Sequence, residues 1–400
     1  MAVGLSPLVE RIAGKGARAW DIHAQALAAK AKGDDVILLS IGDPDLATPA
    51  PIVQRAVAAL QQGDTHYTAI QGEPALRAAI AERFGARTGL EVGADRVCVL
   101  AGAQNGLFCA SLLCLRPGDQ VLVLDPCYVT YEATIRVSGA EPVVVPSPPE
   151  TGFRPDLDAL ARAITPNTRA IWLNNPANPT GVNWTRAELE VVAQVAEGHD
   201  LWVISDEVYG GLVFEAEHIS IAALPGMAER TVTVSSLSKS HAMTGWRLGW
   251  IIAPEALIHH TGNLALAMLY GLPGFVQQAA CQALADDAAI IAEMRRIYRT
   301  RRDHVLALLA KAPGTTALVP EAGMFLMLDV RGVSPTSEAF AWGLLQQQGV
   351  CVLDGAAFGD SSAGHVRLSY TLDLPELTRA CRRIEAFCRD GSLGLSADVS

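Results

Sequence analysis

The residues able to do chemistry lie in four short polar segments. These are Gly102-Ala103-Gln104, Asn174–Gly181, Asp206–Tyr209 and Ser236–Lys239, and each follows an apolar run. In open α/β sheets, ligands bind beyond the carboxyl ends of the strands, where loops carry the functional groups. An amine, a carboxylate, amide and phenol donors, and a glycine that opens a helix are together what a pyridine aldehyde phosphate requires. The four segments therefore predict a site for such a compound.

None of these segments is sufficient alone. A lysine in a serine-rich loop is usually a solvated charge, and an aspartate at the end of a strand is usually a cap or turn residue. The run Asn178-Pro179-Thr180-Gly181 is by itself only a turn signal. The prediction rests on their occurrence together, in one order along one chain.

A regular alternation of elements has to position the four segments. Helical or polar sequence separates most of the apolar runs; examples are Gln104–Leu115, which ends before a Pro-Gly turn, and Arg186–Glu197, which ends at Gly198. This rhythm predicts an α/β fold whose large domain has a mostly parallel, seven-stranded sheet between helices. The seven runs expected as strands are Val97–Leu100, Val121–Leu124, Val143–Val145, Ala170–Leu173, Trp202–Ser205, Thr231–Val234 and Leu248–Ile252.

The pattern changes after Leu284. A long charged helix is expected at Ala288–Lys311, and a last helix at Leu374–Arg389. Short strands are expected between them, near Met324–Val330 and His365–Tyr370. We therefore expect a large domain at residues 46–287 and a smaller α+β domain at residues 288–400. The helical segment Leu5–Lys32 lies within residues 1–45, which we assign to the smaller domain as an N-terminal arm.

Composition excludes several classes of function. The chain has 400 residues and a formal net charge of −11, which opposes the basic face that nucleic-acid binding requires. No apolar run reaches the roughly 18 residues needed to span a bilayer, and the first thirty residues lack the apolar stretch of a signal peptide. The eight cysteines are scattered without a Cys-x-x-Cys pair, so we expect reduced thiols, a cytoplasmic location and no metal site.

The ordered set of motifs resembles one enzyme family. Gly-Ala-Gln, Asn-Pro-x-Asn-Pro-Thr-Gly, Asp-x-x-Tyr and Ser-x-Ser-Lys, with Arg247 eight residues after Lys239, resemble the class I/II aminotransferases of the type I pyridoxal-phosphate fold. The resemblance extends from Ile41–Asp45 to His365–Ser369. It implies the type I fold, pyridoxal 5'-phosphate as cofactor, and transfer of an amino group from an L-amino acid to a 2-oxo acid by a ping-pong mechanism.

The resemblance also assigns roles around the cofactor ring. Lys239 would hold the cofactor as a Schiff base and then move the substrate's α-proton. Asp206 would pair with the pyridine nitrogen, so that the ring withdraws electrons. Tyr209 and Asn178 would donate hydrogen bonds to the phenolate oxygen, and Tyr128 would stack on the ring face.

A second group would hold the phosphate at a helix N-terminus, where free amides and the helix dipole favour an anion. The resemblance implies that this group contains Gly102, the amides of Ala103 and Gln104, and the side chains of Ser236, Ser238 and Arg247. Tyr67, in the run His66–Gly72, matches a tyrosine that reaches the phosphate in the neighbouring subunit. A homodimer is therefore expected.

The substrate would bind between the domains. Arg367 matches the arginine that grips the α-carboxylate with its planar fork, and Gly42 and Asn178 would lie beside the substrate. Finer details, among them Ala19–His23, resemble members that move the amino group of L-arginine to pyruvate. A guanidinium needs a carboxylate or an aromatic surface, and Trp20 and Asp21 are the candidates that we name, although a packing Trp beside a solvated Asp fits equally well.

Other functions stay open at this point. Broad-specificity aspartate and aromatic aminotransferases share every motif, and C–S lyases, racemases and decarboxylases share the fold and the cofactor residues. A nicotinamide-dependent dehydrogenase is disfavoured because no Gly-x-Gly-x-x-Gly opens a helix. A pyridoxal-sensing transcription regulator is disfavoured by the charge, and a catalytically inactive relic by the complete set of site residues.

Overall fold

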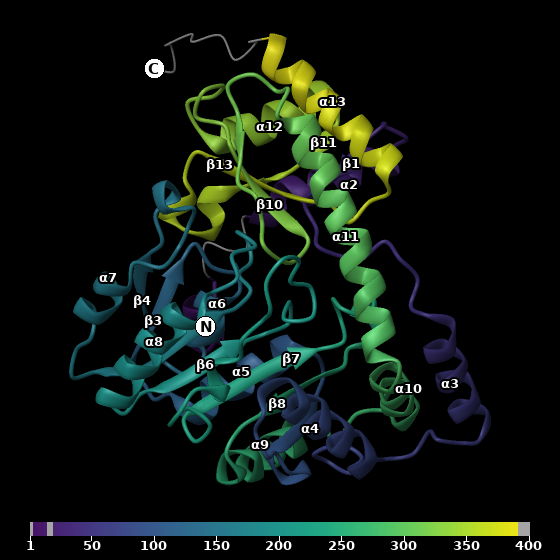
Figure 1. Cartoon of the computed structure of the whole chain (residues 1–400), viewed down its shortest axis with the longest axis vertical. Coiled ribbons are helices and arrows are strands. Elements are labelled where there is room, and N and C mark those ends of the chain that lie inside the picture. The colour runs from purple at the N-terminus through teal and green to yellow at the C-terminus, as the bar shows by residue number, and fades with distance from the viewer. Residues whose placement is uncertain (1–2, 14–18, 391–400) are drawn as a thin grey trace.

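A seven-stranded sheet forms the centre of the larger lobe in the computed structural model, which describes residues 3–13 and 19–390 (Figure 1). The strand order is β2-β8-β7-β6-β5-β3-β4. The strands from β7 to β4 in this order are parallel to one another, and β8 is antiparallel to both of its neighbours, β2 and β7. All seven predicted strands are confirmed. Their bounds are β2 Val97–Leu100, β3 Gln120–Asp125, β4 Glu141–Pro146, β5 Thr168–Asn174, β6 Trp202–Asp206, β7 Thr231–Ser236 and β8 Gly249–Ile252.

Helices cover both faces of this sheet because side chains alternate along each strand. In β3, Val121 and Val123 pack toward α5 and α9, whereas Leu122 and Leu124 pack toward α8 on the opposite face. Thr185 and Glu188 form a capping box that starts α8. The helices of this lobe are α3 Ala50–Gln61, α4 Pro74–Thr88, α5 Ala103–Cys114, α6 Tyr131–Arg136, α7 Leu157–Arg162, α8 Arg186–Gly198, α9 Glu255–Met268 and α10 Gly274–Ala285.

The smaller lobe is built on a four-stranded antiparallel sheet in the order β12-β13-β10-β9. Among the described residues, its core packs that sheet against four helices, one of them from the N-terminal segment. A short parallel pair, β1 with β11, joins the beginning of the chain to it. The bounds are β1 Ile37–Leu38, β9 Thr316–Ala317, β10 Phe325–Asp329, β11 Val350–Cys351, β12 Leu353–Asp354, β13 His365–Ser369, α11 Asp287–Leu309, α12 Ser337–Gln348 and α13 Leu374–Asp390.

The second helix of the N-terminal segment packs against the smaller lobe. Within Leu5–Lys32 the structure has two helices, α1 Leu8–Arg11 and α2 Asp21–Ala31, and residues 14–18 lie outside the described part. Ile22 and Ala26 of α2 belong to the smaller lobe's core. The limits predicted for the two domains, residues 46–287 against residues 1–45 with 288–400, stay a prediction.

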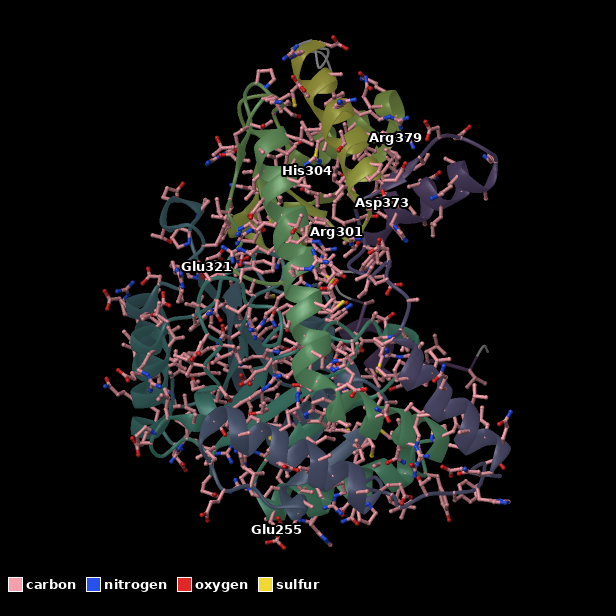
Figure 2. The ribbon with its side chains drawn as sticks, turned by 45° about the vertical axis from the view of Figure 1, so that its right-hand side comes forward. Glu255, Arg301, His304, Glu321, Asp373 and Arg379 are labelled. Carbon is pink, nitrogen blue, oxygen red and sulfur yellow. The ribbon has the colours of Figure 1, made fainter. Side chains whose placement is uncertain are left out.

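Helix α11 connects the two lobes, running from the sheet lobe up to α12 and α13 (Figure 1). Arg301, labelled near the middle of this helix in Figure 2, donates to both carboxylate oxygens of Asp45 at 2.6 and 2.9 Å. This pair fixes the segment that carries Gly42 against the helix. Among the described residues, no helix is long and apolar enough to cross a membrane.

Candidate active site

A cavity of about 340 Å³ lies between the lobes, at the carboxyl ends of β5, β6 and β7. Loops that follow these strands form its floor, and β13 with the segment after β1 closes it from the smaller lobe. Most of the predicted site residues meet here. Those that line the cavity are Trp20, Gly42, Ala103, Gln104, Tyr128, Asn178, Asp206, Tyr209, Ser236, Ser238, Lys239, Arg247 and Arg367.

Lys239 follows β7 and extends its amine toward the smaller lobe. Its Nζ donates to the carbonyl oxygen of Gly42 at 2.7 Å. Burial, together with the positive charges of Arg367 and Arg247, lowers the pKa of this amine to about 8, although the carboxylate of Asp43 opposes the shift. An amine with this pKa is partly unprotonated near neutral pH, so it can act as a nucleophile and as a base.

Gly42 lets the chain pass close to the site. A Cβ built at this position would lie 2.0 Å from the ring of Phe325. No side chain fits there unless that ring moves. The backbone carbonyl that receives the lysine therefore depends on glycine.

Asp206 ends β6 and is 5% exposed. Its Oδ2 accepts a hydrogen bond from the hydroxyl of Tyr131 at 2.7 Å, and its Oδ1 accepts one from the amide of Val208 at 3.2 Å. Burial raises the pKa of this carboxyl to about 6, against the lowering effect of the Tyr131 hydrogen bond. Asp206 forms no ion pair within the described part of the chain, so a cationic ligand atom would be its natural partner.

Tyr131 lines the cavity beside Asp206, and the sequence analysis did not name it. It is 1% exposed, and its ring lies edge-on to Tyr128, with 5.8 Å between the ring centroids. The one available signal was its position three residues after Tyr128, which places both on one face of a helical turn. Nothing in the sequence says that this face meets the end of β6.

A phosphate-sized anion would fit where α5 begins. Gly102 precedes the helix with φ of 86°, and the first-turn residues Ala103 and Gln104 line the cavity. Amides of a first turn have no partner within their own helix. A Cβ at Gly102 would lie 2.4 Å from Nη2 of Arg247, so the guanidinium sits directly against this turn. The helix start and the arginine together form a receptor for an anion.

Two serines extend this receptor from the end of β7. Ser236 is 3% exposed and Ser238 is 8% exposed, and both line the cavity. The Ser236 hydroxyl accepts a hydrogen bond from the amide of Ser238 at 3.3 Å. Both serines therefore lie at the carboxyl end of the sheet, and the Ser236 hydroxyl is held there by this bond.

Arg367 lies on β13 with 1% of its surface exposed. Its guanidinium stacks 4.0 Å from the ring centroid of Phe325 and 4.6 Å from that of Phe358. Nη1 donates to Oδ1 of Asn178 at 2.9 Å, and Nη2 donates to the carbonyl of Ser40 at 2.6 Å, while Nε is buried without a partner. Burial lowers the pKa of Arg367 to about 10, which leaves it cationic near neutral pH. A fixed buried cation of this kind suits a carboxylate.

The two remaining phenols stay protonated donors. Burial raises the pKa of Tyr209 and of Tyr128 above the ordinary value. Tyr209 is 4% exposed and packs edge-on against Phe325. Each can therefore donate its hydroxyl hydrogen to a ligand oxygen.

Three predicted residues do not line this cavity: Gly102, which lies directly before the lining residues of α5, and Asp21 and Tyr67, which lie elsewhere. Asp21 is exposed at the start of α2, although Trp20 beside it does line the cavity. The acidic group at the mouth is instead Asp43, whose Oδ1 accepts a hydrogen bond from Thr244 at 2.6 Å. Tyr67 is 84% exposed and packs against Tyr270, with 4.7 Å between the ring centroids.

Comparisons with known proteins agree with this geometry. The family described as aminotransferase class I and II matches residues 34–384. A Pseudomonas aeruginosa protein named arginine–pyruvate transaminase AruH is 52% identical over 97% of this chain and 99% of its own length. An aspartate aminotransferase of Musicola paradisiaca is 39% identical over 93% of this chain and 94% of its own length. The solved structure of the Thermus thermophilus aspartate aminotransferase with maleate superposes with a TM-score of 0.91 at 35% identity, covering 96% of this chain and 100% of that one.

Proposed function

The chain belongs to the class I and II aminotransferases, and we propose that it transfers the amino group of L-arginine to pyruvate with pyridoxal 5'-phosphate as its cofactor. One observation carries the proposed chemistry: the buried amine of Lys239 shares a cavity with the buried carboxylate of Asp206 and the buried guanidinium of Arg367. The choice of substrates is supported by the 52% identity to the Pseudomonas aeruginosa transaminase.

The residues present fit this cofactor. Asp206 is a buried carboxylate in need of a cation, which a protonated pyridine nitrogen would supply. The start of α5 and Arg247 would receive the phosphate, and Tyr209 would donate to the phenolate oxygen. When bound, pyridoxal phosphate withdraws the electrons released as a bond to the substrate's α-carbon breaks.

Lys239 would carry both the cofactor and the proton. Its pKa of about 8 lets Nζ take up and release a proton near neutral pH. We propose that Nζ binds the cofactor's aldehyde carbon at rest. Once the substrate amine has displaced it, Nζ would remove the hydrogen from the substrate's α-carbon. Its contact with the Gly42 carbonyl would hold the free amine within the cavity.

Arg367 would bind the carboxylate that both substrates share. An amino acid and a 2-oxo acid both carry a carboxylate next to the reacting carbon, so one arginine can orient each in turn, as a ping-pong reaction requires. Phe325 and Phe358 clamp its guanidinium, and Asn178 holds Nη1. The arginine is thus in place before the substrate arrives.

The distal guanidinium of L-arginine needs its own partner. We propose that Trp20 and Asp43, which both line the cavity, contact this group. Asp43 takes the role that the sequence analysis gave to Asp21, since Asp21 does not line the cavity.

A homodimer is part of the proposal. Tyr67 does not line the cavity of its own chain and is 84% exposed, which supports a role at the phosphate of a second subunit. A cytoplasmic location is supported by the eight cysteines, which are all free of disulfides.

A panel of amino donors against pyruvate and 2-oxoglutarate tests the proposal. The expected result is the highest kcat/KM for L-arginine with pyruvate. Without a 2-oxo acid, we expect release of at most one equivalent of product per active site, because a ping-pong enzyme stops after its first half-reaction. A preference for aspartate or aromatic donors would instead identify the protein as a broad-specificity aspartate or aromatic aminotransferase. Continued turnover without any 2-oxo acid, beyond one equivalent per active site, would indicate a lyase of the same fold.

A further inference from the structure

A second cavity of about 360 Å³ lies on the opposite face of the large sheet from the α5 and α9 layer. Its walls are α4, the loop after β6, the strands β7 and β8, and the beginning of α11. It does not contain any residue that lines the active site. Its volume is close to that of the active site, so it has room for a small organic molecule.

The floor of this cavity is polar where a sheet face is normally apolar. Thr233 and Ser235 of β7 point into it, while Val232 and Val234, which alternate with them, pack in the core on the other face. Thr233 is 2% exposed, and its hydroxyl has no hydrogen-bond partner. A buried hydroxyl without a partner is costly unless a ligand or water satisfies it.

Three arginines converge on the cavity. Arg83 and Arg87 of α4 share a single carboxylate, that of Asp287, with N to O distances of 2.8 Å each. Arg295 of α11 donates its Nε to the carbonyl of Gly211 at 2.8 Å, and it forms no ion pair within the part of the chain that the structure describes. Within the described part of the chain, Asp287 is the carboxylate that pairs with these arginines, and Arg295 is left without one.

Two further carboxylates line the cavity, and among the described residues neither forms an ion pair with the three arginines. Glu207 is buried, and its oxygens are occupied by Ser205 and Ser220 hydroxyls and by Nε2 of His218. Glu217 is exposed to solvent at the mouth. Its charge is therefore screened.

The arginines also repel one another. Burial is the largest cause that lowers the pKa of Arg83 to about 10, and the positive charge of Arg87 is the next. The same two causes lower the pKa of Arg295. A bound anion would relieve both effects, because it supplies negative charge in a partly desolvated site.

We propose that this cavity is a binding site for a small organic anion, a carboxylate or a phosphate ester, held by Arg83, Arg87 and Arg295 with Thr233 donating from the floor. Arginine forks match the geometry of both anions. Phe84 and Trp250, which line the same cavity, offer apolar surface for the body of the ligand.

Isothermal titration of the holoenzyme with malonate and with inorganic phosphate tests the site. Cofactor bound at Lys239 keeps its own phosphate receptor filled, and an Arg367→Gln variant removes the carboxylate receptor of the active site. The expected result is saturable binding of at least one probe that survives Arg367→Gln. If phosphate binds more tightly than malonate, the natural ligand is assigned as a phosphate ester. If malonate binds more tightly, it is assigned as a carboxylate.

Matched variants on α11 locate the binding. Arg295→Gln should weaken the probe by about tenfold or more, as the loss of a charged hydrogen bond predicts. Arg296→Gln removes the same charge from the neighbouring position, which is paired with Glu293 and does not line the cavity, and it should leave the affinity unchanged. Thr233→Val, which keeps the shape of the floor, should weaken the probe by roughly 2- to 10-fold. Equal affinities for the Arg295 and Arg296 variants, or no saturable binding in Arg367→Gln, would overturn the proposal.

Discussion

The carboxyl of Asp206 should make the cofactor-free protein less stable as the pH rises. Its pKa is raised from 3.8 to about 6 in the fold, so the folded state holds a proton that the unfolded chain has already released. The stabilisation that this bound proton contributes is fully present below 3.8, the pKa of the carboxyl in the unfolded chain, and it is lost as the pH rises through about 6, its pKa in the folded protein. A shift of about two units corresponds to about 3 kcal/mol, at about 1.36 kcal/mol per unit.

Urea unfolding of the apoenzyme between about pH 4 and pH 8 measures this effect. Asp206→Asn is the matched variant, because an amide oxygen can still accept the Tyr131 hydrogen bond but cannot ionise. Relative to the parent, this variant should gain stability as the pH rises, by about 3 kcal/mol at the upper end, while its affinity for pyridoxal phosphate falls. A stability difference that does not change with pH would refute the reasoning.

Three further substitutions probe the other parts of the site. Asp43→Asn should lower the ratio of kcat/KM for L-arginine to kcat/KM for L-alanine roughly tenfold or more. The control, Asp21→Asn, should leave this ratio unchanged. Equal ratios in the two variants would exclude Asp43 as the contact of the distal guanidinium. Arg367→Lys should lower kcat/KM for every donor by roughly 10-fold or more, because an ammonium cannot form the paired bonds, and the cofactor's absorbance spectrum should not change; a loss confined to one donor would contradict the assigned role. Gly102→Ala should weaken cofactor binding in equilibrium dialysis, because its Cβ would meet a guanidinium 2.4 Å away. Gly118→Ala is its control, since Gly118 has a similar positive φ of 88° and its Cβ would meet no atom within 4 Å. Equal cofactor affinities in the two variants would contradict the assigned phosphate receptor.

Much of the fold follows from local sequence pattern. The run Val97–Leu100 is a strand with the predicted bounds because four buried apolar residues stand between Arg96 and the turn at Ala101-Gly102. The direction of β8 could not be predicted, since an apolar run looks the same in a parallel and an antiparallel strand. The described residues of Leu5–Lys32 form α1 and α2, and α2 packs on the smaller lobe; that packing depends on residues far along the chain.

The site was predictable where residues directly follow strands. Asp206 ends β6 and Lys239 follows β7, so the neighbouring strand ends bring them into one cavity. Tyr131 was missed because its contact with Asp206 joins positions 75 residues apart. The sequence analysis named Asp21, whereas Asp43 lines the cavity, for a similar reason: proximity in sequence to Trp20 does not determine which carboxylate faces the cavity.

The central claim is that Lys239 holds the cofactor, and reduction with borohydride followed by peptide mass mapping tests it most directly. Reduction makes the link between a lysine and the cofactor permanent, so the modified peptide identifies the lysine. The mass of one reduced cofactor is expected on the peptide that contains Lys239, and it should be absent from that peptide in a Lys239→Ala variant. A modified peptide elsewhere in the chain, or the parent's visible absorbance band in Lys239→Ala, would contradict the claim.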